Sequence, residues 1–230
     1  MWLSNFKYAP YSYSKLSTHI SCPRKFKYAY IDKAPKSETD KTALLKGGAI
    51  HSIIESHPEK SSHKLAPKYQ DIANNFINSN LGQKYLSVQK VAEASFGLDK
   101  DFRPVGYSDK NAIIRGYIDH VCVLDNVLNI GDWKTGRLRE ERFQDYNQLK
   151  IYGVYFFQRY PTLDTIRISY VYVEHEEAEN PMLLERKYLE HYIKIIKDYI
   201  LAVETDDCFD KNKTKLCDWC EYKEHCDGEK

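Results

Sequence analysis

Apolar residues recur three and four positions apart through the first quarter of the chain. This spacing predicts a helix over 13–31, which Pro23 interrupts or kinks. A second apolar series predicts a helix over 42–56, and a weaker series predicts a third helix over 66–80. The N-terminal part, residues 1–60, is therefore expected to be helical.

The pattern then changes to short apolar or alternating runs separated by turn residues. These runs predict strands over 87–96, 112–124, 127–133 and 165–173. A helix is expected over 140–160, where Pro161 ends it, and a long helix from Pro181 to about residue 203. The last segment, 206–230, has little periodicity and is rich in cysteine.

This order of elements predicts one domain over 1–230. The length of 230 residues allows a substantial core but is short for two independent domains. Helices, then strands, then helix, strand and helix predict an α/β fold with a mixed central β-sheet flanked by helices. Its sheet core is expected over 87–175, and the sequence contains no internal repeat.

Composition indicates a globular protein, with 42% hydrophobic and 13% aromatic residues. The sequence contains neither an apolar run of about 20 residues nor a signal peptide, so we expect a soluble, cytoplasmic protein without a membrane partner. Net charge is +1, but residues 1–50 hold nine Lys/Arg against three Asp/Glu, whereas 171–230 hold nine against sixteen. This asymmetry fits a protein that binds a polyanion with one basic face. It also fits ordinary charged residues on solvent-exposed helices.

Three charged residues stand within apolar strand segments: Asp119, Asp132 and Lys134. Such groups are costly to bury unless they are paired or bind a metal. On a strand, Asp132 and Lys134 point to one face and Trp133 to the other. A tight turn at 125–126 would bring Asp119 toward Asp132. The set suits metal-assisted attack of water on a phosphodiester. The alternative is a surface ion pair between Asp132 and Lys134.

Further motifs follow in a fixed order. Ser-Tyr-Ser-Lys-Leu-Ser begins at 12, Cys-Pro-Arg-Lys-Phe-Lys-Tyr at 22 and Gly-Gly-Ala-Ile-His at 47. Gly-Tyr-Ile-Asp begins at 116, Asp-Trp-Lys-Thr-Gly at 132 and Gln-Leu-Lys-Ile-Tyr at 148. This ordered set resembles the RecB-like branch of the PD-(D/E)XK nuclease superfamily, which includes CRISPR adaptation nucleases and phage exonucleases. The resemblance spans almost the whole chain and implies a restriction-endonuclease-like core.

The resemblance implies roles for the charged residues. Asp119 and Asp132 would be the primary ligands of Mg²⁺ or Mn²⁺, helped by the backbone carbonyl of Trp133. His51, from the second helix, would be a further ligand; a lone helical histidine would otherwise be a solvated or core residue. Lys134 would orient the attacking water or stabilise charge on the phosphate.

Three other residues are candidates for supporting roles. Glu93 would add an acid to the site or lie exposed on its strand. Gln148 and Tyr152 fall four apart on one helix face. They would contact a phosphate or bound DNA, or simply pack against each other.

Three cysteines in the tail have the spacing of a thiolate metal site: Cys217, Cys220 and Cys226. Such a site needs a fourth ligand. The resemblance supplies Cys22, whose Cys-Pro-Arg-Lys-Phe setting is similar to that of the iron–sulfur nucleases in this branch. Cys208 is the alternative fourth ligand.

The favoured occupant of this Cys-rich metal-binding tail is a [4Fe–4S] cluster, and the alternative is structural Zn²⁺. Either would join the tail to the N-terminal helix. The sixth cysteine, Cys122, lies on a predicted strand and is expected to be a small buried hydrophobe.

These features predict a metal-dependent DNA nuclease, specifically an exonuclease on single strands or duplex ends. The sequence has no Walker motif, so the protein would work alone or with a separate helicase, recombinase or CRISPR integrase. Two alternatives stand beside this hypothesis: a catalytically idle DNA-binding or assembly subunit, and an endonuclease of the same superfamily. DNA recombination, DNA repair and CRISPR adaptation remain the candidate processes.

Overall fold

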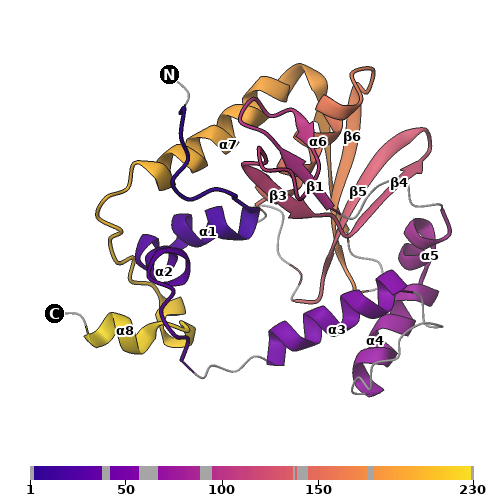
Figure 1. The fold of residues 1–230 in the computed structure, drawn as a ribbon. Helices are drawn as coiled ribbons and strands as arrows, with labels where there is room; N and C mark the ends of the chain where they lie inside the picture. Colours follow the sequence, from indigo (N-terminus) through magenta and orange to yellow (C-terminus); the bar gives the residue numbers. More distant parts are fainter. Residues whose placement is uncertain are drawn as a thin grey trace.

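The computed structural model describes residues 3–37, 42–56, 67–88, 95–136, 138, 145–175 and 179–228. Over these residues the chain has a mixed α/β architecture in which helices flank a central mixed sheet (Figure 1). This confirms the predicted fold class. Within the same ranges no helix has the length and hydropathy of a membrane span.

The N-terminal helices agree with the predicted pattern. They are α1 (Tyr13–Ser21), α2 (Pro23–Phe26), a π-helical turn (Lys27–Ile31), α3 (Thr42–Ser56), α4 (Pro67–Asn78) and α5 (Asn80–Leu86). Ser12 caps α1, because its side chain accepts a hydrogen bond from the backbone N of Lys15 at 3.2 Å. Cys22 is extended between α1 and α2, since a residue before proline avoids the helical region.

The strands of the described residues form two sheets. They are β1 (Ser95–Leu98), β2 (Pro104–Val105), β3 (Ile114–Tyr117), β4 (His120–Leu124), β5 (Val127–Lys134), β6 (Thr165–Tyr172) and β7 (Glu179–Glu185). The small antiparallel sheet has the order β2-β1-β3, and the larger one the order β4-β5-β6-β7. Only the β5–β6 pair of these sheets is parallel, so the larger sheet is mixed, as predicted.

The remaining helices lie between and after these strands. They are α6 (Asn147–Arg159), a 3-10 helix (Arg186–Tyr188), α7 (Leu189–Glu204), a second 3-10 helix (Lys215–Trp219) and α8 (Lys223–Gly228). The tight hairpin predicted at 125–126 is present between β4 and β5. Asp125 and Asn126 have φ of 52° and 62°, the left-handed angles that a two-residue hairpin of this kind requires.

Four predicted boundaries are wrong. The helix expected over 140–160 begins at Asn147, and residues 145–146 before it are not helical. The strand over 112–124 breaks before Asp119 into β3 and β4, which belong to different sheets. The strand over 87–96 starts too early, because α5 reaches Leu86 and a turn follows it. The helix expected from Pro181 is preceded by β7, an edge strand that tolerates proline; the sheet core therefore extends past residue 175.

The larger sheet separates two hydrophobic clusters. On β5, Leu128 and Ile130 pack with α6 and α7, whereas Trp133 packs with α3, α4 and α5. The alternation of a strand therefore puts Asp132 and Lys134 on the α6 side, as predicted. Cys122 is fully buried in the second cluster, which confirms its predicted role as a small core residue.

Candidate metal centre

Asp119 lies where the two sheets part. It occupies the bend between β3 and β4, directly before the last paired residues of β4 and β5, His120 and Gly131. Its Oδ2 accepts a hydrogen bond from the backbone N of Trp133 at 2.8 Å. The backbone N–H of Trp133 lies beyond the last β4–β5 pair, so it has no partner on β4. The Asp119 carboxylate accepts this hydrogen bond, which fixes the position of the carboxylate.

The carbonyl of Trp133 points to the same edge of β5 as its N–H. The next residue, Lys134, directs its carbonyl toward β6, where it accepts a hydrogen bond from the backbone N of Val173 at 2.9 Å. Successive residues of a strand direct their backbone polar groups to opposite edges. The carbonyl of Trp133 therefore points to the side where its N–H meets Asp119, which is compatible with its predicted role as a ligand.

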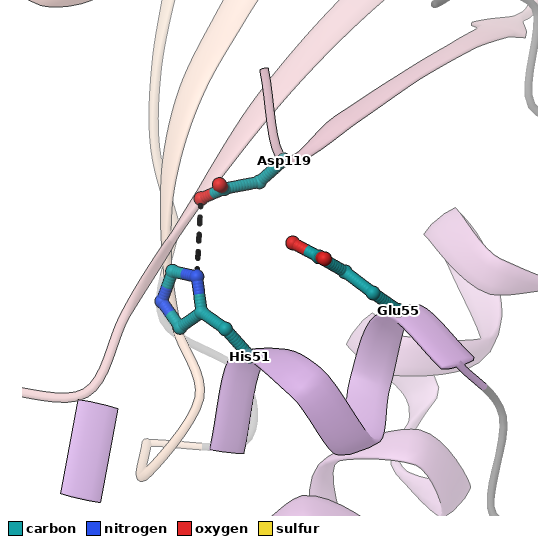
Figure 2. A group of neighbouring side chains, drawn as sticks. All are labelled: His51, Glu55 and Asp119. Atoms are coloured by element: carbon teal, nitrogen blue, oxygen red, sulfur yellow. Dashed lines mark ion pairs between the residues drawn. The ribbon is translucent and has the colours of Figure 1, made fainter. Parts of the chain in front are cut away.

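Two residues of α3 complete a cluster around Asp119. His51 and Glu55 are four apart, so they share one helix face. Figure 2 shows both side chains directed toward Asp119, and His51 Nδ1 lies 3.6 Å from Asp119 Oδ2. One ligand atom from each of the three residues lies within 4.8 Å of the others, so the group could hold a metal ion.

The electrostatics of His51 reflect this acidic setting. Burial by itself lowers the pKa of the imidazole, but the Asp119 carboxylate, with Asp132 and Glu55, outweighs it, so the net pKa is raised. A site that attracts a proton to His51 also attracts a divalent cation, for the same electrostatic reason. The two compete for the same nitrogen.

Asp132 is almost completely buried on β5, at 3% exposure. Its Oδ2 is in contact with the ammonium of Lys134, and the described residues give that oxygen no hydrogen bond besides. Burial raises the pKa of Asp132 to about 6, although Lys134 pulls it down, and Asp119 raises it further. A buried carboxylate with spare acceptor capacity is a suitable group for a cation to bind.

Gln148 and Tyr152 extend this arrangement along α6. Lys134 Nζ donates to Gln148 Oε1 at 3.4 Å, and Gln148 Nε2 donates to the Tyr152 hydroxyl at 2.8 Å. Burial, and then the charge of Asp132, raises the pKa of Tyr152, so its hydroxyl stays protonated. The two residues do contact each other, and both also line a cavity beside the charged cluster.

The structure brings most of the predicted site residues together. Asp119 and His51 belong to the group of three, whereas Asp132 is turned to Lys134 and lies outside that group. Glu55 was missed, although its spacing of four residues from His51 on a helix was a usable signal. Glu93 lies outside the described residues.

The donors fit a hard divalent cation. Carboxylates and a backbone carbonyl are ligands for Mg²⁺ and Mn²⁺, and Mn²⁺ also accepts imidazole. His51, Glu55 and Asp119 would hold the ion, with Trp133 O and Asp132 beside it.

Four of the six cysteines line a second cavity, of about 610 Å³, between the N-terminal helices and the tail. They are Cys22, Cys217, Cys220 and Cys226. Cys208 is exposed and is not among the lining residues. In the described part of the chain, their sulfur atoms do not form a group as compact as that of His51, Glu55 and Asp119.

Contacts between the N-terminal helices and the tail hold this second cavity together. Arg24 Nε donates to the Phe209 carbonyl and Asn212 Nδ2 donates to the Ser21 carbonyl, both at 2.8 Å. The rings of Phe26 and Phe209 stack with centroids 6.1 Å apart. These bonds bring Cys22 beside cysteines that lie almost two hundred residues later in the sequence.

Comparison with known proteins identifies the superfamily of the chain. The family model of the PD-(D/E)XK nuclease superfamily matches residues 10–227, and the chain therefore belongs to that superfamily. The superfamily resemblance noted in the sequence is thereby confirmed, while the RecB-like branch and the iron–sulfur type stay predictions. A search of the curated proteins found no match.

Two solved structures are similar to this chain. One is a putative exonuclease from Eubacterium rectale, 16% identical, with a TM-score of 0.54 over 92% of this chain and 86% of that chain. The other, named SSO0001, is 14% identical, with a TM-score of 0.41 over 97% and 89% of the two chains. The first likeness supports the fold alone, and the second is too weak to carry an argument.

Proposed function

We propose that this chain is a metal-dependent DNA exonuclease that hydrolyses phosphodiesters at the ends of single strands or duplexes. The observation that carries the proposal is the convergence of Asp119, His51 and Glu55, with Asp132 and Lys134 on the neighbouring strand. Membership of the nuclease superfamily supports phosphodiester hydrolysis as the chemistry of this cluster. The putative exonuclease among the solved structures shares the fold and is consistent with the end-directed activity.

Each residue of the cluster has a role that follows from its position. Asp119, His51 and Glu55 would hold Mg²⁺ or Mn²⁺, and Asp132 would lie beside the ion. The bound cation would polarise the phosphate and lower the pKa of a nearby water. Lys134 keeps its ammonium on Asp132 until substrate enters, and it can then orient the water or stabilise charge on the phosphate.

Gln148 supports that role of Lys134. Its Oε1 accepts from the ammonium while its Nε2 donates to Tyr152. Because Tyr152 remains protonated, this chain of bonds limits the positions open to the ammonium. We expect Gln148 and Tyr152 to contact a phosphate or another part of bound DNA.

End-labelled single-stranded and duplex DNA, incubated with Mg²⁺ and with Mn²⁺, tests this function. We expect shortening from an end, no cleavage of a covalently closed circle, and no activity in an Asp119→Asn variant of unchanged fold. Cleavage of the closed circle would identify an endonuclease. Absence of cleavage on every substrate would leave the idle binding or assembly subunit as the better account.

The cysteine cavity belongs to the same proposal. We propose that Cys22, Cys217, Cys220 and Cys226 hold a [4Fe–4S] cluster that links the tail to the first helices, as in the iron–sulfur nucleases that the sequence resembles. Such a cluster would stabilise the fold. Wild-type protein purified anaerobically should show the visible absorbance of an iron–sulfur cluster. The Cys22→Ala variant should lack this absorbance. One zinc per chain in colourless protein would refute the iron assignment.

The candidate processes are DNA recombination, DNA repair and CRISPR adaptation. In each, the protein would work alone or with a separate helicase, recombinase or CRISPR integrase. DNA is the first partner to test, because the cavity beside Gln148 has an aromatic and basic lining.

A further inference from the structure

A groove of about 780 Å³ lies beside the candidate active site and is lined partly by the N-terminal end of α1. Gln148 and Tyr152 are among its lining residues, and Gln148 accepts a hydrogen bond from Lys134 of the candidate site. Tyrosines dominate its walls: Tyr11, Tyr13, Tyr30, Tyr107, Tyr117 and Tyr152. We call it the tyrosine groove. Its residues come from the N-terminal segment, α1, the π-helical turn, β1, the β2–β3 loop, β3 and α6.

The charges of the tyrosine groove favour an anion. Its lining residues include Lys15 and Arg115 but no Asp or Glu, in a chain that has 33 acidic residues. Ser12 and Ser14 add hydroxyl groups where α1 begins, and this end of a helix carries partial positive charge. The lining residues thus supply two cations and no carboxylate, and the nearby Asp145 carboxylate accepts a hydrogen bond from the Tyr13 hydroxyl at 2.7 Å.

The part of the groove formed by β3 and the loop before it presents aromatic faces. Tyr107 and Tyr117 pair with ring centroids 4.8 Å apart, and Tyr117 is 60% exposed. Tyr117 and Arg115 are two apart on β3, so they share a face. A large aromatic side chain left this exposed beside an active site is available for a ligand.

The aromatic wall is held in place before any ligand binds. The guanidinium of Arg115 lies 5.7 Å from the centroid of the Tyr107 ring and donates to the Asp109 carbonyl at 2.9 Å. Backbone bonds within the loop, from Asp109 to Gly106 and from Ala112 to Asp109, fix it further. A preformed surface loses less conformational entropy when it binds.

We propose that the tyrosine groove binds an unpaired DNA strand and delivers it to the active site, with a base stacked on Tyr117 and phosphates along the start of α1. The proposal rests on the nuclease function above and narrows its substrate. Stacking on aromatic side chains requires bases whose faces are free, and in a duplex those faces are covered by neighbouring base pairs. A blunt duplex would have to fray before it could enter.

Binding without cleavage tests this directly. Fluorescence anisotropy in EDTA would compare a labelled oligothymidylate of about 15 nucleotides with a blunt duplex of equal length. We expect the single strand to bind more tightly, and Tyr117→Ala to weaken it on the order of tenfold. Tyr117→Phe keeps the ring and should bind like wild type. Tyr188→Ala, which removes an exposed tyrosine outside the groove, is the matched control.

A charge introduced at the start of α1 gives a second test. Ser14 is exposed in the first turn of α1, where an acidic residue stabilises a helix. Ser14→Asp should therefore fold normally but weaken the binding of oligothymidylate, because it adds a carboxylate to lining residues that include no Asp or Glu. Ser87→Asp, an exposed position after α5, should leave binding unchanged.

The outcomes separate this inference from the proposed function. Equal binding of strand and duplex would overturn it, and so would equal losses in Tyr117→Ala and Tyr188→Ala. An inactive protein that still bound single strands through Tyr117 would contradict the nuclease proposal while upholding the groove. An active nuclease whose DNA affinity was unchanged by Tyr117→Ala and by Ser14→Asp would uphold the nuclease proposal and contradict the role of the groove.

Discussion

Removal of one buried carboxylate should destabilise the N-terminal segment that forms part of the tyrosine groove. Glu204, the last residue of α7, is 6% exposed. Its carboxylate accepts hydrogen bonds from the backbone N atoms of Lys7 and Tyr8, both at 3.0 Å, and from the Tyr11 hydroxyl. Glu204 therefore ties residues 7–11 to the far end of α7.

The cost of losing this carboxylate follows from its partners. A hydrogen bond to a charged group contributes about 1.5–3 kcal/mol, and a buried donor left without a partner costs about 1–3 kcal/mol. Three such bonds share one acceptor, and water can reach part of the segment after truncation. We therefore expect Glu204→Ala to lower the free energy of unfolding by about 4 kcal/mol. At roughly 2–4 °C per kcal/mol for a chain of this size, Tm should fall by about 10 °C.

Thermal and urea unfolding, followed by circular dichroism, would measure this loss. Glu204→Gln keeps one acceptor oxygen and should lose about half as much. Glu190→Ala, on an exposed turn of the same helix, is the control and should cost less than about 1 kcal/mol. If Glu204→Ala and Glu190→Ala unfold alike, the carboxylate does not hold the N-terminal segment.

Three other substitutions test the site and its framework. Glu55→Gln should weaken Mn²⁺ binding in calorimetry by roughly tenfold or more, and Glu190→Gln should not; equal affinities would remove Glu55 from the metal site. Lys134→Met should slow DNA cleavage by about 100-fold or more at unchanged fold, and near-normal rates would refute its role. Gly82→Ala would place Cβ 1.8 Å from the Phe76 carbonyl oxygen and should destabilise by about 2–4 kcal/mol, whereas Gly48→Ala meets nothing and should be neutral or stabilising.

The positions of Asp132 and Lys134 could be predicted from the sequence because they depend on the local pattern of a single strand. Alternation along β5 was enough to put Asp132 and Lys134 on one face, with Trp133 on the other. The Asp-Asn pair of the hairpin was also recognisable, since few residues adopt left-handed angles without strain.

Other features depend on tertiary contacts that leave no local trace. The apolar run over 112–124 is continuous, yet β3 pairs with β1 and β4 pairs with β5, so the chain bends at Asp119. Nothing in the run itself marks that bend. Pro181 suits the first turn of a helix and an edge strand equally well, and pairing with β6 decided in favour of β7.

The site also contains groups that only the fold brings together. The spacing of Glu55 from His51 showed a shared helix face, but not that this face meets Asp119. The tyrosine groove combines residues from several separate segments, each unremarkable by itself. In the cysteine cavity, the tail spacing indicated three members, while Cys22 came from the family resemblance and was then found on the same cavity.

The most direct test of the account is digestion of end-labelled single-stranded DNA with Mn²⁺, using the wild-type protein and the Asp119→Asn variant side by side. Melting curves would first establish that both proteins are folded. The account predicts progressive shortening by the wild type and none by the variant. Equal cleavage by the two proteins, or no cleavage by a folded, metal-loaded wild type, would contradict the claim that Asp119 and its neighbours form a nuclease active site.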